Sequence, residues 1–115
     1  MSNTQQLEIF IETEGDAKIV RPVCDIDLSG APALRQQISQ AQQEHPTRLI
    51  VDLSGVPYMD SSGLATLVEA MQIARRNDAL LIICSLQDKV RSIFEIARLD
   101  MVFKIAQNRD DAISM

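Results

Sequence analysis

Apolar and polar positions alternate in the first part of the chain, and this pattern predicts two β-strands. Aliphatic side chains occupy positions 7, 9 and 11, which is the two-residue period of a strand. Gly15 and Asp16 interrupt the pattern, and the β-branched residues of Ala17–Val23 resume it. The chain is therefore expected to open with a hairpin.

Later segments have the period of an amphipathic helix. Gly30, Ala31 and Pro32 suit a helix start, because proline is tolerated in the first turn. We expect this helix to end at 44–47, a second helix over 62–77, a third opened by a capping box of Ser85 and Asp88, and a short fourth near 109–113. The expected core-facing residues of the first three helices are Leu34, Ile38 and Ala41; Leu64, Leu67, Val68, Met71 and Ala74; and Val90, Ile93, Phe94 and Ala97.

Two nearly unbroken apolar runs, 48–53 and Leu80–Cys84, are typical of strands buried on both faces. A further short strand is predicted near 102–105. The alternation of strands and helices predicts an α/β fold, with a mostly parallel sheet, an N-terminal hairpin strand and about four helices. A chain of 115 residues is long enough for one compact domain, in which residues 1–6 are expected to be a flexible N-terminus.

Charge and hydropathy argue against nucleic acid and the membrane interior as binding partners. The formal net charge is −5 and the sequence pI is about 4.7, which argues against binding to nucleic acid. The basic pair Arg75 and Arg76 falls where a helix should end, and cations there interact favourably with the helix dipole. No apolar run approaches the roughly 18 residues of a membrane span, so we expect a cytoplasmic protein with no direct membrane insertion.

The cysteines and the histidine give little sign of a metal or redox site. Cys24 and Cys84 are far apart in the sequence and belong to no CxxC motif, so both are interpreted as reduced, buried thiols. His45 is the only histidine and precedes a proline in a connecting segment. We interpret it as a surface loop residue.

Functional loops of a parallel sheet collect at the carboxyl ends of its strands. Here they are the loop with Asp25 and Asp27, the loop 54–62 and the loop 85–87. All three are expected to lie at one edge of the sheet.

The segment 59–63 leads directly into a predicted helix. Spacing alone favours capping, in which Asp60 or Ser61 accepts hydrogen bonds from free amides of the first turn. An exposed serine at this position also suits phosphorylation, since a phosphate would meet the positive end of the helix dipole. Both roles can hold together, with Asp60 as the cap and Ser61 presented to solvent.

The sequence does not favour catalysis. A serine nucleophile needs a base, and His45 is predicted at the opposite edge of the sheet. Four carboxylates could indicate Mg²⁺, but Asp52 lies inside a strand, and Asp25, Asp27 and Asp60 suit turns and caps. We expect no enzymatic activity, no metal site and no cofactor.

From about residue 7 to residue 113, the chain resembles the STAS domain of the bacterial anti-sigma-factor antagonists. The most specific part is the stretch 49–64, which contains Asp60, Ser61, Ser62 and Gly63. The acidic turn 25–27 leads into the first helix as it does in that family. Spaced apolar residues of the C-terminal half also match, namely Val90, Phe94, Leu99 and Phe103.

The resemblance implies a protein-binding switch. Ser61 would be phosphorylated by a partner that is both anti-sigma factor and serine kinase, of the histidine-kinase-like ATPase type. The unmodified chain would bind this partner and free the sigma factor, and a phosphatase acting on phospho-Ser61 would restore that state. The implied partner-binding residues are Asp25, Asp27, Asp60, Ser61, Ser62 and Gly63.

One residue departs from the family pattern, and one alternative function stays open. Cys24 stands where the family usually has glycine, directly before the acidic turn that contains Asp25 and Asp27, and a larger side chain here could alter that turn. Other STAS domains are accessory subunits of lipid ABC transporters or modules of stress-signalling assemblies. The intact segment 60–63 favours the phosphorylation switch.

Overall fold

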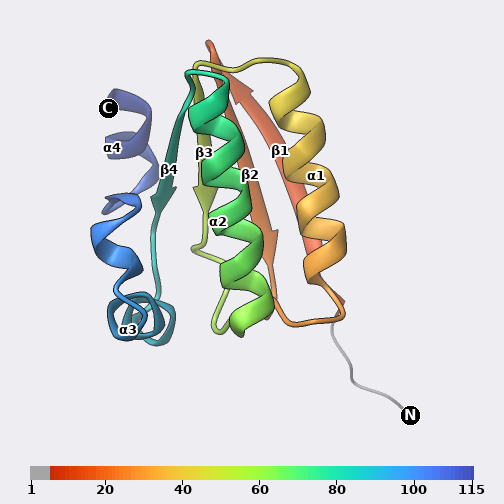
Figure 1. Cartoon of the computed structure of the whole chain (residues 1–115), viewed down its shortest axis with the longest axis vertical. Helices are drawn as coiled ribbons and strands as arrows, with labels where there is room; N and C mark the ends of the chain where they lie inside the picture. The colour runs from red at the N-terminus through yellow and green to blue at the C-terminus, as the bar shows by residue number, and fades with distance from the viewer. Residues whose placement is uncertain (1–5) are drawn as a thin grey trace.

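A five-stranded sheet forms the centre of the computed structural model, which describes residues 6–115 (Figure 1). The strand order is β1-β2-β3-β4-β5; β1 and β2 pair antiparallel, and the other neighbours pair parallel. The elements are β1 (Glu8–Glu14), β2 (Ala17–Val23), α1 (Ala31–Gln43), β3 (Arg48–Asp52), α2 (Ser61–Arg76), β4 (Leu80–Cys84), α3 (Asp88–Ile96), a 3-10 turn η1 (Leu99–Met101), β5 (Lys104–Ala106) and α4 (Arg109–Ser114).

The predicted α/β class, hairpin and mostly parallel sheet are confirmed. The expected flexible segment lies outside the described residues except for Gln6, which belongs to no helix or strand. The short strand predicted near 102–105 forms later, at Lys104–Ala106. The reason is that the backbone N–H groups of Val102 and Phe103 still donate to the carbonyl of Leu99 in the preceding turn.

The predicted capping box before α3 is wrong. Gln87 is the N-cap of α3, and its side chain makes no cap hydrogen bond. Ser85 has a φ of 61°, and its N–H donates to the carbonyl of Ala106 beside the end of β4. Ala97, expected in the apolar stripe, is exposed because α3 ends at Ile96 and Ala97 is only its C-cap.

The larger hydrophobic core fills one face of the sheet. Figure 1 shows α1 and α2 side by side over this face. Leu34 and Ile38 of α1, Leu67 of α2, and Val90 and Phe94 of α3 are buried there. The apolar stripes predicted from the sequence therefore supply most of the helix residues in this core.

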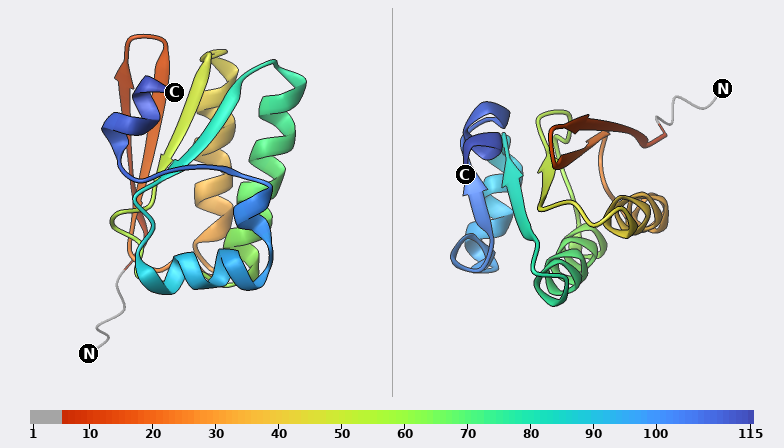
Figure 2. Two further views of the ribbon diagram at one scale, coloured as in Figure 1. Left: turned by 90° about the vertical axis from the view of Figure 1, so that its left-hand side faces the viewer. Right: turned by 90° about the horizontal axis from the view of Figure 1, so that it is seen from above.

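A smaller core lies on the other face of the sheet. Ile19, Ile50 and Ile82 from three neighbouring strands are fully buried there with Ala112 of α4. Figure 2 shows α4 on the side of the sheet opposite to α1 and α2. The central strands are thus covered on both faces, as their continuous apolar sequences predict.

None of the helices formed within residues 6–115 has the length and apolar character needed to cross a bilayer.

Candidate functional site

Two of the loops at the carboxyl edge of the sheet are joined by backbone hydrogen bonds. The N–H of Cys24 donates to the carbonyl of Gly55 at 2.9 Å, and the N–H of Ile26 donates to that of Tyr58 at 3.0 Å. In the other direction, the N–H of Asp60 donates to the carbonyl of Ile26 at 3.1 Å. The loop after β2 therefore pairs with the loop after β3, up to Asp60, the residue directly before α2.

The loop after β4 joins the same edge. The side-chain amide of Gln87 donates to the carbonyl of Ser54 at 2.8 Å. The prediction that all three loops lie together is therefore confirmed. His45 lies in the connector between α1 and β3, at the other end of the sheet, where it is exposed.

Asp60 is the N-cap of α2. Its Oδ1 accepts hydrogen bonds from the N–H of Ser62 at 2.9 Å and from the N–H of Gly63 at 3.4 Å. The Ser62 hydroxyl also donates to Oδ1, at 2.5 Å. This hydroxyl, followed by the backbone N–H groups of Ser62, Gly63 and Leu28, lowers the pKa of the Asp60 carboxyl against the opposing effect of desolvation. Of the two candidate caps, Asp60 is the one used.

Ser61 and Ser62 differ in what their hydroxyls can do. Ser61 is the first residue of α2 and is exposed, and no hydrogen bond joins its hydroxyl to any residue in 6–115. Ser62 is half-buried, with its hydroxyl committed to Asp60. Only the Ser61 hydroxyl is therefore presented to a partner without breaking a hydrogen bond of the fold.

Asp27 organises the start of α1 in a similar way. Its Oδ1 accepts from the Ser29 hydroxyl at 2.7 Å and from the N–H groups of Ser29 and Gly30 at 3.0 and 3.1 Å. The Ser29 hydroxyl is the main cause that lowers the pKa of Asp27, whereas the nearby charge of Asp60 raises it. The two carboxylates are therefore electrostatic neighbours on one surface.

This edge has unneutralised negative charge. Within the described chain, neither Asp27 nor Asp60 has an ion-pair partner. Asp25 is also exposed, directly before the buried Ile26. No group of three or more histidine, cysteine, aspartate or glutamate side chains in residues 6–115 is arranged to hold a metal ion.

Gly63 lies beneath this surface. A Cβ atom built on it would come within 2.9 Å of Ile26 Cγ2 and 3.2 Å of Met59 Cβ. Only glycine lets α2 pack this closely against the loop after β2. The structure thus places Gly63 under the exposed residues, where it sets the distance between the two loops.

Asp52 is separate from the other three carboxylates considered in the sequence. Its Oδ2 accepts from Arg109 Nη2 of α4 at 3.1 Å, and its Oδ1 accepts from the N–H of Ser54 at 3.0 Å. Arg109 also forms an ion pair with Glu12 of β1 at 2.5 Å. Asp52 therefore helps to hold α4 on the second face of the sheet.

The two cysteines form no disulfide, but they differ in environment. Cys84 is buried as predicted, and burial, with the charge of Asp52, raises the pKa of its thiol to about 11. Cys24 is only half-buried, which the sequence interpretation missed. Its φ is 101°, a backbone conformation that favours glycine.

We expect Cys24→Gly to stabilise the protein. Release of backbone strain of about 1–3 kcal/mol exceeds the roughly 0.5–1 kcal/mol entropic cost of glycine, so the free energy of unfolding should rise, by up to about 2.5 kcal/mol. Chemical denaturation of both proteins measures this. Cys24→Ala is the matched control, because it removes the thiol and keeps the strain. A gain with alanine equal to that with glycine would show that the thiol, not the backbone, is responsible.

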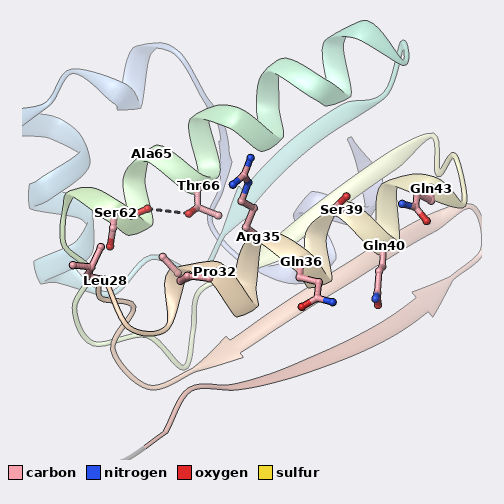
Figure 3. Close-up of a pocket in the computed structure, with 11 residues that line it drawn as sticks. Leu28, Pro32, Arg35, Gln36, Ser39, Gln40, Gln43, Ser62, Ala65 and Thr66 are labelled. Atoms are coloured by element: carbon pink, nitrogen blue, oxygen red, sulfur yellow. Dashed lines mark hydrogen bonds between the residues drawn. The ribbon is translucent and has the colours of Figure 1, made fainter.

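A shallow groove runs from the edge along α1 and α2. Figure 3 shows Leu28 at one end of it, beside Ser62, with the side chains of α1 following along its length. Leu28 and Tyr58 are 77% and 46% exposed at this edge, and neither was among the partner-binding residues predicted from the sequence. For Leu28 the available signal was an apolar residue between the turn-forming polar residues Asp27 and Ser29. The lining residues are Leu28, Ala31, Pro32, Arg35, Gln36, Ser39, Gln40, Gln43, Ser62, Ala65 and Thr66.

Comparison of the sequence with known protein families identifies one family. The family model of the STAS domain matches residues 8–112. The chain belongs to the STAS domain family. The family predicted from the segment 49–64 and the acidic turn is thereby confirmed.

Individual relatives show how far the similarity extends. The anti-sigma-B factor antagonist of Staphylococcus aureus is 31% identical over 95 residues, which are 81% of this chain and 88% of that protein. A crystal structure of an anti-sigma factor antagonist from Mycobacterium paratuberculosis has a TM-score of 0.89 and 24% identity, covering 99% of this chain and 97% of the other. The Bacillus cell fate determinant SpoIIAA, in its phosphorylated form, has a TM-score of 0.72 and 20% identity, covering 93% and 97%. These structural similarities concern the fold.

Proposed function

We propose that this chain is an anti-sigma-factor antagonist switched by phosphorylation of Ser61. The unphosphorylated form binds an anti-sigma factor that is also a serine kinase of the histidine-kinase-like ATPase type, and the sigma factor is released. The observation that carries the proposal is the exposed Ser61 hydroxyl, free of hydrogen bonds within residues 6–115 at the start of α2. The names of the sequence relatives support the antagonist role.

The phosphorylation step transfers the γ-phosphoryl group of ATP to Ser61. A bond forms between the Ser61 Oγ and the γ-phosphorus while the bond to the β,γ-bridging oxygen breaks, and ADP leaves. The hydroxyl proton passes to a base of the kinase, because His45 lies at the other end of the sheet and the neighbouring Asp60 carboxylate accepts hydrogen bonds from Ser62 and Gly63 and none from the Ser61 hydroxyl. The chain therefore acts as substrate and binding partner.

The fold can accept the phosphate. It is added at the N-terminal end of a 16-residue helix, where the helix dipole favours negative charge. Asp60 keeps its cap on Ser62 and Gly63, since none of these bonds uses the Ser61 hydroxyl. A phosphatase that hydrolyses phospho-Ser61 returns the chain to its binding-competent state.

Incubation with the anti-sigma kinase and ATP tests the proposal. We expect the intact mass to rise by one phosphoryl group, Ser61→Ala to abolish this, and Ser62→Ala to keep most of it. Adjacent residues at a helix start point about 100° apart, so one kinase cleft cannot present both hydroxyls equally. Ser62→Ala is the matched control, although it also removes a hydrogen bond to Asp60, so thermal melting of each variant should accompany the assay.

Peptide mapping decides the outcome. Phosphate found mainly on Ser62, Thr66 or Ser85 would contradict the assignment to Ser61. If no candidate kinase modifies the chain and it instead copurifies with a transporter ATPase, the accessory-subunit function would replace the one proposed.

A further inference from the structure

Leu28 is the more exposed of the two large apolar side chains that are open to solvent in the loops before α1 and α2. It is 77% exposed, compared with 46% for Tyr58. Leu28 also lines the groove between α1 and α2 together with Ser62 (Figure 3). An apolar side chain so open to water contributes little to the stability of the fold. Its burial by a partner would contribute favourably to the free energy of binding.

Hydrogen bonds hold the backbone on both sides of Leu28. The side chain of Asp27 accepts hydrogen bonds from the N–H groups of Ser29 and Gly30. The backbone carbonyl of Asp27 also accepts a hydrogen bond from the N–H of Gly30, at 3.1 Å. The N–H of Leu28 itself interacts with the carboxylate of Asp60. The side chain therefore projects from a fixed turn, so binding loses little conformational entropy in ordering this loop.

Two negatively charged carboxylates lie close to Leu28. Asp27 precedes it, Asp60 contacts its backbone, and within the described chain neither carboxylate is neutralised by an ion pair. A second copy of the chain is a poor occupant, because a symmetric contact would bring these carboxylates toward their own equivalents in a chain of net charge −5. A partner with cations around an apolar pocket is complementary.

We propose that Leu28 is the apolar anchor through which this chain binds its anti-sigma partner, which supplies an apolar pocket bordered by lysine or arginine side chains. The inference rests on the proposed function and adds to it a residue that decides affinity. Buried apolar anchors at the centre of an interface carry a large share of its binding free energy. Leu28 contributes to affinity, while Ser61 controls it.

Calorimetric titration of the unphosphorylated chain with the anti-sigma kinase tests this anchor. Leu28→Ala should weaken binding by about tenfold or more, which corresponds to about 1.4 kcal/mol. Leu28→Met, which keeps the apolar volume, should stay within about threefold of the wild type. Met115→Ala is the matched control, since Met115 is 43% exposed at the end of α4, which Figure 1 shows at the end of the molecule opposite to the starts of α1 and α2, and it should change affinity less than about twofold.

Added salt tests the charged border of the pocket. Affinity of the wild type should fall as ionic strength rises, because exposed charges are screened beyond a Debye length of about 8–10 Å at 0.1–0.15 M salt. An affinity independent of salt would overturn the cationic border. Thermal melts should be the same for all variants, because Leu28 is hardly covered by the fold.

The possible failures can be told apart. If the wild type binds the kinase and Leu28→Ala binds equally well, the anchor is refuted and the proposed function stands. If the wild type binds no anti-sigma factor and receives no phosphate, the proposed function fails and the anchor fails with it.

Discussion

Phosphorylation of Ser61 is expected to weaken the complex with the anti-sigma partner by at least about tenfold, or 1.4 kcal/mol. The modification adds about −1.5 to −2 charges at neutral pH, on an edge that already carries Asp27 and Asp60. In a kinase complex, the Ser61 oxygen must face the phosphates of the bound nucleotide. After transfer, the new phosphate therefore lies against the remaining phosphates of ADP, in a cleft shaped for a neutral hydroxyl.

The expected magnitude follows from Coulomb's law. Two like unit charges about 4 Å apart repel by roughly 4 kcal/mol at an effective dielectric constant of 20, which corresponds to about a thousandfold in affinity. Cations of the partner and ordered water offset part of this. Tenfold is therefore the lower bound that we expect.

The fold should change little on phosphorylation. The N-terminus of α2 offsets the charge by about 0.3–1 kcal/mol, and the cap made by Asp60 does not involve Ser61. The measurement is calorimetric titration of unmodified, phosphorylated and Ser61→Asp protein, with thermal melts of each. Equal affinity for modified and unmodified chains would refute the switch. A collapse of the melting temperature on phosphorylation would show that unfolding, and not interface repulsion, is the mechanism.

Phe94→Ala should produce the largest loss of stability among the substitutions considered. Phe94 is fully buried, and its ring packs against Phe103 with centroids 5.6 Å apart. This pair joins α3 to the segment before β5. Truncation to alanine removes the contact and leaves a cavity, so the free energy of unfolding should fall by about 3–5 kcal/mol in urea denaturation.

Two further variants make this stability test specific. Phe94→Leu keeps much of the volume and should lose clearly less than the alanine variant. Ile96→Ala, on the same helix but 84% exposed, should change stability by less than about 0.5 kcal/mol. A loss below about 1 kcal/mol for Phe94→Ala would contradict the packing of α3 described here.

Local patterns in the sequence were enough to predict the order of the helices and strands and the fold class. The continuous apolar run of Leu80–Cys84 and the helical spacing of Leu34, Ile38 and Ala41 are determined by which faces must be buried, and this depends only on neighbouring residues. Parallel strands then bring their carboxyl ends to one edge, so the joining of loops 24–27, 54–60 and 85–87 was predictable as well. The roles of Asp60 as the helix cap and of Ser61 as the exposed neighbour were also predictable, because the cap and the first helical residue are adjacent in the chain.

Local pattern was insufficient where a side chain depends on distant residues. Spacing alone did not show that the Ser62 hydroxyl is occupied by Asp60 while that of Ser61 is free, or that Ser85 leaves β4 through a left-handed turn. It also predicted burial for Cys24, which the structure shows half-buried with a positive φ.

Contacts across the sheet were decided only by the tertiary structure. Arg109 joins Asp52 and Glu12 from sequence separations of 57 and 97 residues, so no local period can reveal the pairing. The exposure of Leu28 was decided in the same way, because the turn made by Asp27 and the contact with Asp60 come from two different loops. Periodicity reports which face of an element is buried, whereas these features depend on which elements meet, and only the folded chain determines that.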